Sequence, residues 1–237
     1  MNHLTFPIIQ SVLNKTQIGE LYNLGEDVSF IKHKSGFCYI TNYKTSVNQN
    51  LLNIILEETY PKYTHIYDAS EDLVNFISAK KDCFNTKIRN RIVLQHNGQI
   101  KLLDFDTSIV QIVNVSDIEN ESLEQFPLEL FSRYWNGKDD FVLNSMGVIV
   151  LYNQEPASIC YSAANDHRAE VDIYTFEQYR GKNLAKIAAS AFIMKCKINN
   201  IIPNWDCFAD NIASVKIAQS LGFKITDEYT LLSIYKL

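Results

Sequence analysis

The stretch at 170–193, EVDIYTFEQYRGKNLAKIAASAFI, runs from an alternating apolar strand through YRGKN into an alanine-rich helix, with no proline between them. A strand that ends abruptly at a helix leaves the first helical N–H groups without partners, and these groups attract an anion. Gly181 would let the backbone approach a phosphate, and Arg180 and Lys182 add positive charge. Asn183 tolerates a left-handed backbone. The turn favours a pyrophosphate, although short Arg-Gly turns also occur at ordinary helix starts.

The turn differs from two common phosphate-binding loops. It lacks the GxxxxGK[ST] pattern of a Walker loop, and it lacks the three spaced glycines and the following acidic residue of a dinucleotide fold. The charge balance is also informative, since the formal net charge is −5 and the isoelectric point is about 5.6. Because Lys and Arg are neither in excess nor clustered, we do not expect binding to DNA or other nucleic acid.

Cysteine and histidine usage argues against a metal site. The sequence has five cysteines without a CxxC pair and five histidines without HxxxH or HxxE spacing. We therefore expect reduced, mostly buried thiols and no metal ion. The cysteines are Cys38, Cys83, Cys160, Cys196 and Cys207, and the histidines are His3, His33, His65, His96 and His167.

The N-terminal residues lack the features of a signal peptide, and no apolar stretch reaches membrane-spanning length. This pattern predicts a soluble, cytoplasmic protein that does not associate with a membrane.

The chain of 237 residues, 46% of them hydrophobic, can form two lobes. We predict a smaller N-terminal α/β domain at 1–105, with a role that the sequence leaves open, and a second domain at 106–237. No glycine- and proline-rich linker and no internal repeat is visible. We therefore place the boundary where a new strand pattern begins, at 108–113.

Local patterns predict the elements of each domain. The first should contain strands at 28–33, 36–43 and 64–69, helices at 48–60 and at 71–81 after the N-cap Ser70, and a type I′ hairpin at Asn97-Gly98. The second should contain an acidic helix capped by Ser116 or Asp117 and interrupted by Pro127, and two strands within 147–163 around a turn at Asn153 to Pro156. It should also contain strands at 169–176 and 203–208, a helix at 211–221 ended by Gly222, and one or two closing strands.

Two motifs together resemble the GNAT superfamily of acetyl-CoA-dependent N-acetyltransferases. The turn R-G-K-G-x-G/A of that family is similar to residues 180–185, RGKNLA. Its second element, N-x-x-A/S-x-x-L/I ending in G-F, is similar to Asn211, Ser214, Ile217 and the LGF at 221–223. The combination of YRGK, PNWDC and SVKIAQSLGF looks like one bacterial GNAT subfamily, and the resemblance covers about residues 106–237.

The resemblance implies an α/β chain of the α+β type, with a C-terminal GNAT fold whose mixed, mostly antiparallel central sheet is flanked by helices. It implies an acyltransferase that moves the acetyl group of acetyl-CoA to a primary amine of a small molecule or peptide by direct attack on the thioester. The alternative is a CoA-binding or acyl-CoA-binding regulatory module with weakened catalysis. The sequence leaves the acceptor open, as well as the choice between monomer and homodimer.

By resemblance, the backbone near the end of the strand at 169–176 would meet the acetyl carbonyl, and the turn and second motif would hold the rest of acetyl-CoA. The residues implied are Ile173, Thr175, Arg180, Gly181, Lys182, Asn183, Leu184, Ala185, Asn211 and Ser214.

Two positions depart from the family pattern. Asn183 replaces a glycine of the phosphate turn, so we expect weakened binding of the pyrophosphate. Ala218 stands where many members carry a tyrosine that protonates the departing thiolate. Tyr229 is a candidate substitute acid, and an aromatic residue at a strand junction is the alternative.

Acetyl transfer requires removal of a proton from the attacking amine. Glu170 and Asp172 alternate along one strand and should lie on the same face, where they could hold the amine and relay its proton through water. The alternative is two solvated carboxylates on a sheet face. For Cys160 and Cys207 we expect core packing rather than an acetyl-cysteine intermediate, because neither has an adjacent histidine.

The residues Arg133, Tyr134 and Trp135 are candidates for the acceptor pocket, because they fall where GNAT acceptor loops usually lie. An ordinary core anchor is the equal alternative.

Overall fold

The computed structural model describes residues 5–57, 61, 63–99 and 103–237, and these divide into two compact units. The first unit contains residues 1–92, 207–210 and 227–237, and the second contains 93–206 and 211–226. This division differs from the predicted one, which placed a single boundary between residues 105 and 106. The reason is that the long strands β5 (Phe84–His96) and β11 (Phe223–Lys236) each belong partly to both units.

The first unit has the sheet order β1-β2-β3-β4-β11-β5. Its other strands are β1 (Gly19–Gly25), β2 (Val28–His33), β3 (Phe37–Ile40) and β4 (Tyr63–Ile66). Its helices are α1 (Pro7–Leu13), α2 (Asn48–Glu57), which follows the short 3₁₀ helix η1 (Thr45–Val47), and α3 (Glu71–Ser78). The predicted strands and helices of this region are therefore confirmed, and Ser70 caps α3 by accepting a hydrogen bond from Leu73 N at 3.4 Å.

The core of the first unit includes side chains from the end of the chain. Leu232 and Ile234 of β11 are 0% and 1% exposed and lie in one apolar cluster with Leu51, Ile66 and Leu73. In register, β11 pairs antiparallel with β4. The C-terminal strand is thus a structural part of the N-terminal unit.

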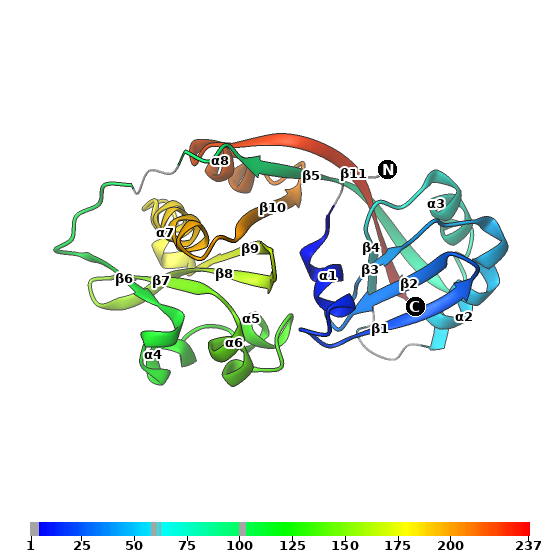
Figure 1. Cartoon of the computed structure of the whole chain (residues 1–237), viewed down its shortest axis with the longest axis horizontal. Helices are drawn as coiled ribbons and strands as arrows, with labels where there is room; N and C mark the ends of the chain where they lie inside the picture. The colour runs from blue at the N-terminus through cyan, green and yellow to red at the C-terminus, as the bar shows by residue number, and fades with distance from the viewer. Residues whose placement is uncertain (1–4, 58–60, 62, 100–102) are drawn as a thin grey trace. The chain divides into compact units, whose positions relative to one another are not determined.

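The second unit has the sheet order β11-β5-β10-β9-β8-β7-β6, and α7 packs against β7, β8 and β9 (Figure 1). Its other strands are β6 (Val110–Asn114), β7 (Gly147–Tyr152), β8 (Glu155–Asn165), β9 (Arg168–Thr175) and β10 (Ile202–Phe208). Its helical segments are η2 (Val115–Asp117), α4 (Asn120–Glu124), α5 (Leu128–Ser132), α6 (Lys138–Asn144), η3 (Glu177–Tyr179), α7 (Leu184–Ile198) and α8 (Ile212–Ser220). Antiparallel pairs predominate in both units, as predicted.

Two local predictions are wrong. The predicted type I′ turn at Asn97-Gly98 is wrong, because Asn97 has no positive φ and its N–H donates to Gly222 O. Residues 100–102 of the predicted second strand lie outside the described residues. The two consecutive positive φ angles of a type I′ turn occur at Asn153 and Gln154, between β7 and β8.

The acidic helix is also shorter than predicted. Ser116 and Asp117 lie in η2, and α4 follows the N-cap Glu119, which makes no side-chain capping bond. Pro127 separates α4 from α5, as predicted, because proline cannot supply the backbone N–H that a continuous helix needs. Residues 223–236 form one closing strand.

The two halves of the chain repeat one order of elements. Residues 19–96 run β1-β2-β3-α2-β4-α3-β5, and residues 147–236 run β7-β8-β9-α7-β10-α8-β11. In each series the first two pairings are antiparallel and the third is parallel. The N-cap side chains Ser70 and Asn211 even accept from the equivalent backbone amide, three residues later. The structure therefore contains an internal repeat that the sequence does not reveal.

We predict that the fragments 1–105 and 106–237 will not fold separately. The first would lose the β11 side chains Leu232 and Ile234 from its core, at a cost of about 1.5 to 3 kcal/mol each. The second would expose the same side chains to water. Thermal unfolding followed by circular dichroism should be cooperative for the full chain and for an equimolar mixture, but not for either fragment alone. A cooperative transition in an isolated fragment would contradict this assignment.

Candidate functional site

The parallel strands β9 and β10 are paired over only part of their length. Their register runs from the pair Ile202 and Arg168 to the pair Asn204 and Glu170. Beyond that point β9 continues to Thr175 and pairs with β8 on its other side. We call the stretch beyond this register, where β9 and β10 are no longer paired, the opening. It lies at the carboxyl end of the parallel pair, which is where α/β sheets usually bind ligands.

A turn with two left-handed residues connects β9 and η3 to α7. Gly181 has φ +80°, and Asn183 has φ +61° and ψ 10° as the N-terminal residue before α7. A Cβ atom added at Gly181 would meet no protein atom within 4 Å, so the space above the turn is open. Asn183 has the left-handed backbone that a glycine readily adopts, which accounts for its tolerance at this position.

The turn leaves consecutive backbone amides unbonded. The first amides of α7 to donate within the chain are those of Lys186 and Ile187, each 3.0 Å from Asn183 O. The amides of residues 181–185 donate to no group in the described ranges of the chain. Arg180, Lys182 and Asn183 are exposed, and no acidic side chain lies in the first turn of α7. This cluster of amides at a positive helix end fits an anion such as a pyrophosphate.

Part of the second motif stabilises α8. Asn211 Oδ1 accepts from Ser214 N at 3.2 Å, and Ser214 Oγ accepts from Trp205 Nε1 of β10 at 3.0 Å. Both side chains therefore hold the start of α8 relative to the strand beside the opening. Ala218 is buried within the same helix.

The two predicted carboxylates lie on β9 with different partners. Glu170 is only 6% exposed, and its Oε2 accepts from Asn204 Nδ2 at 2.7 Å. Asp172 Oδ2 accepts from the Tyr161 hydroxyl at 3.0 Å. Burial, and then the nearby Asp172 charge, raise the pKa of Tyr161 well above its usual value, so this phenol stays neutral and donates.

The sequence did not single out Tyr161 or Asn204 as partners of these carboxylates. Tyr161 lies opposite Asp172 in the β8–β9 register, and Asn204 lies opposite Glu170 in the β9–β10 register. A pairing register is a long-range property. Only the position of Asn204 inside the PNWDC motif gave a local signal.

Two further predicted cofactor residues lie at the end of β9. Ile173 pairs with Cys160 of β8, and its amide donates to Asp172 Oδ1 at 2.8 Å. The Thr175 hydroxyl lies 2.7 Å from Ser158 Oγ. Both residues are half-buried next to the opening.

The predicted acid Tyr229 lies in the other unit. It belongs to the first unit, where its hydroxyl accepts from Arg91 Nε at 3.1 Å and its ring packs against Phe6 and Tyr67. The structure therefore does not group Tyr229 with the carboxylates of β9 in one unit.

The candidate acceptor residues pack next to β8. Trp135 is buried, and its indole N–H donates to Ser162 O at 3.0 Å. The Arg133 guanidinium carbon lies 5.1 Å from the centre of the Tyr134 ring. Trp135 therefore has the contacts of a buried core residue, which was the alternative to a role in the acceptor pocket.

The comparisons with known proteins agree with this geometry. The family model described as GNAT acetyltransferase matches residues 2–232, which is nearly the whole chain. The chain belongs to the GNAT acetyltransferase family. The match includes the N-terminal region, which the sequence motifs did not reach.

Individual relatives support the family and its fold. The chain is 37% identical over 152 residues to the uncharacterized N-acetyltransferase YdfB of Bacillus subtilis strain 168, and the alignment covers 64% of this chain and 58% of that protein. A GCN5-related N-acetyltransferase-like protein from Streptococcus suis 89/1591 has a TM-score of 0.76 at 18% identity, with 98% of this chain and 94% of that chain covered. A GCN5-related N-acetyltransferase from Kribbella flavida has a TM-score of 0.67 at 12% identity, with 97% of this chain and 93% of that chain covered.

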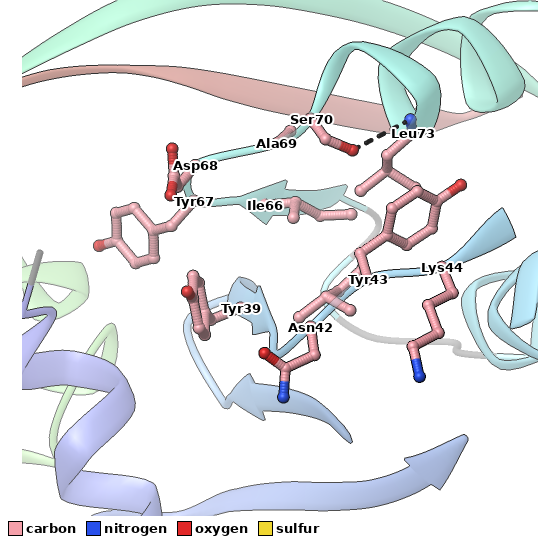
Figure 2. Close-up of a pocket in the computed structure, with 11 residues that line it drawn as sticks. Tyr39, Asn42, Tyr43, Lys44, Ile66, Tyr67, Asp68, Ala69, Ser70 and Leu73 are labelled. Atoms are coloured by element: carbon pink, nitrogen blue, oxygen red, sulfur yellow. Dashed lines mark hydrogen bonds between the residues drawn. The ribbon is translucent and has the colours of Figure 1, made fainter. Parts of the chain in front are cut away.

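The first repeat of this GNAT protein has a different strand-end site. A pocket of about 380 Å³ lies at the carboxyl ends of β3 and β4, with Tyr39, Tyr43 and Asp68 among its lining residues (Figure 2). In this repeat η1 runs directly into α2, whereas the residues 180–183 separate η3 from α7. Residues 41–47 connect β3 to α2 and residues 176–183 connect β9 to α7, so the two connections are similar in length and differ in where the short 3₁₀ helix lies.

Neither metal ligation nor membrane spanning is indicated. Among the described residues, no group of three or more His, Cys, Asp or Glu side chains could hold a metal ion. In the same residues, no helix is long and apolar enough to cross a membrane.

The buried thiols are held in the protonated form. Burial raises the pKa of Cys196 from 9.0 to about 12, and burial also raises the pKa of Cys160 well above its usual value. Since a thiolate is the nucleophilic form of cysteine, these two side chains have the properties of core residues.

We predict an alkaline loss of stability that depends on Cys196. Because its pKa is higher in the folded chain, this thiol stabilises the fold fully below pH 9.0, and that contribution is lost as the pH rises through about 12. The free energy of unfolding, measured with urea, should fall by up to about 1.4 kcal/mol per pH unit from this group. Cys196→Ala should flatten this slope. Equal slopes for Cys196→Ala and the unchanged protein would contradict the assignment.

Proposed function

We propose that this GNAT protein binds acetyl-CoA at the opening between β9 and β10 and transfers its acetyl group to a primary amine. The unbonded amides at 181–185 support this proposal most directly, because they form an anion site at the start of a long helix. Arg180 and Lys182 would add charge to the diphosphate, and Asn211 and Ser214 would hold the adjoining start of α8. The backbone of Ile173 and Thr175 would face the acetyl carbonyl and the arm of the cofactor.

In the proposed reaction, the amine nitrogen attacks the carbonyl carbon of the thioester, the C–S bond breaks, and the sulfur leaves as the CoA thiolate. The attacking amine must lose a proton, and Glu170 or Asp172 would accept it through water. Glu170 is the better supported base, since it is buried on β9 and Asn204 Nδ2 donates to its Oε2 and thereby fixes its orientation. An alkyl thiolate has a pKa of about 8.5, so it can leave without the tyrosine that Ala218 replaces and take its proton from solvent.

The alternative function is a regulatory module that binds CoA and has weak turnover. Asn183 in the phosphate turn and the buried Ala218 favour it, because each departs from the pattern of active members. The motifs YRGK, PNWDC and SVKIAQSLGF are consistent with one bacterial GNAT subfamily, and we propose membership of that subfamily. The acceptor would be an amine on a small molecule or a peptide.

We predict that Arg180→Glu weakens CoA binding at least tenfold, because it places a negative charge beside the diphosphate. Isothermal titration calorimetry with CoA measures the effect. Lys197→Glu is the matched control, since it makes the same charge change at the exposed, opposite end of α7. If the unchanged protein gives no heat with CoA, or if both variants bind equally, the cofactor site is wrongly assigned.

We predict that Glu170→Gln lowers kcat by about 10² while CoA affinity stays unchanged, because general-base catalysis contributes about 10² to 10⁴ in rate. Asp172→Asn should have the smaller effect, since Asp172 is less buried than Glu170, the proposed base. The assay measures CoA release from acetyl-CoA over a panel of amines. Tight CoA binding without amine-dependent release from any acceptor would favour the regulatory alternative.

A further inference from the structure

The two repeats differ by one residue at the start of their last helix. In the first repeat, Ala69 N donates to Thr230 O at 3.0 Å, and the next residue, Ser70, caps α3. In the second repeat, Ala209 N makes the equivalent bond to Asn90 O at 2.9 Å, but Asp210 intervenes before the cap of α8. Asp210 is therefore an insertion relative to the other repeat, at the position just before the cap.

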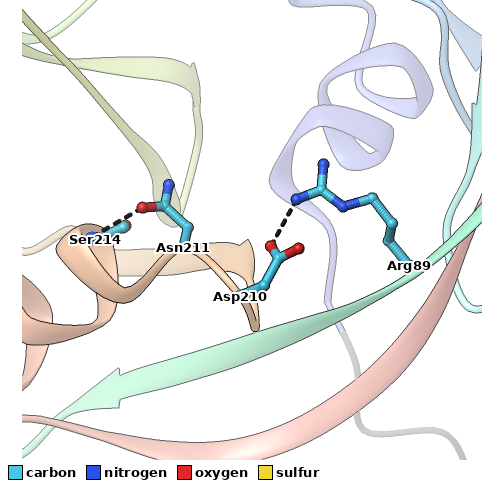
Figure 3. A network of polar contacts seen from close by, with 4 residues as sticks. All are labelled: Arg89, Asp210, Asn211 and Ser214. Atoms are coloured by element: carbon cyan, nitrogen blue, oxygen red, sulfur yellow. Dashed lines mark hydrogen bonds and ion pairs between the residues drawn. The ribbon is translucent and has the colours of Figure 1, made fainter.

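The inserted residue is held by an arginine of β5. Arg89 Nη2 lies 2.6 Å from Asp210 Oδ1 (Figure 3). The guanidinium carbon of Arg89 also lies 3.4 Å from the centre of the Phe208 ring. The neighbouring Asn90 carbonyl accepts from Ala209 N. Residues 208–210 thus contact Arg89 and Asn90 of β5, and the guanidinium carbon of Arg91 lies 4.8 Å from the centre of the Phe208 ring. Asp210 itself is 71% exposed, so burial alone does not fix it.

The segment after Asp210 is equally constrained. Asn211 follows directly in the chain and caps α8 through Ser214 N, and Ser214 is bonded to Trp205 on β10. Figure 3 shows the carboxylate of Asp210 bonded to Arg89 and the amide oxygen of Asn211 directed at Ser214. The direction of the peptide between Asp210 and Asn211 therefore depends on the contacts of Arg89 on one side and on the cap on the other.

We propose that Arg89 is a positioning residue for the cofactor, because it sets the backbone at Asp210 and thereby the start of α8. The proposal rests on the function proposed above, in which Asn211 and Ser214 adjoin acetyl-CoA. An isolated exposed ion pair contributes little, so the ring contact with Phe208 is an essential part of the arrangement. Arginine can make both contacts at once because its guanidinium is planar and carries several donors, whereas a lysine ammonium can satisfy the carboxylate but stacks poorly.

The test compares Arg89→Met and Arg89→Lys with the unchanged full-length protein. Arg89→Met should raise the CoA dissociation constant and the KM for acetyl-CoA by the same factor, about three- to tenfold, with kcat at saturating acetyl-CoA unchanged. For Arg89→Lys, both constants should lie between those of Arg89→Met and those of the unchanged protein. Lys87→Met, at an exposed position of the same strand, is the charge-matched control and should bind CoA like the unchanged protein.

A second pair of variants separates positioning from general destabilisation. Asp210→Asn should reproduce the loss in CoA affinity, and the charge-swapped double variant Arg89→Glu with Asp210→Arg should recover at least half of the affinity lost in Arg89→Glu. If the unchanged protein binds CoA and both Arg89→Met and Asp210→Asn bind it equally well, the positioning role is wrong. If the unchanged protein does not bind CoA, the proposed function itself is wrong, and the role of Arg89 is wrong with it. A lower melting temperature with no change in CoA affinity would also contradict the inference.

Discussion

The change of backbone direction between β9 and α7 is the feature on which the proposed chemistry depends. A helix cannot satisfy its own first amides, and the left-handed residues Gly181 and Asn183 direct the chain so that no other described segment satisfies them. The result is a local positive potential without any need for a buried cation. A net charge of −5 does not oppose this, because the attraction comes from oriented dipoles within hydrogen-bonding distance rather than from the field of the whole molecule.

The strands β5 and β11 link this site to the rest of the protein. Each belongs to both units, so the apolar cores and the sheet cannot be assigned to two consecutive pieces of sequence. Leu232 and Ile234 stabilise the first unit, whereas Phe223, at the start of the same strand, packs edge-on against Trp205 in the second. A family model that covers residues 2–232 is the expected consequence, since neither unit is a separable module of the sequence.

The two repeats share one order of elements and differ at their parallel strand pairs. The β3–β4 register runs to the last residue of β4, whereas the β9–β10 register stops at Glu170 and Asn204, and residues 180–183 follow η3 before α7. The first repeat instead has a pocket with tyrosine side chains at that place. The left-handed turn at residues 181–183 and the inserted Asp210 lie at the two helix starts of the second repeat. Local differences at these helix starts thus distinguish the candidate cofactor repeat from its structural counterpart.

The sequence by itself determined what depends on neighbours along the chain. The strand and helix on either side of the turn, the Ser70 cap, the break at Pro127 and the resemblance to GNAT acetyltransferases all follow from local patterns. Tertiary structure decided what depends on pairing between distant strands. The local sequence at Asn97-Gly98 predicted a hairpin, but Asn97 N donates to Gly222 O instead. The hydrogen-bond partners of Glu170 and Asp172 are set by the pairing registers of β9 with β10 and with β8. Turns and caps involve only a few adjacent residues, whereas registers, repeats and shared strands are set by which apolar faces can be buried together.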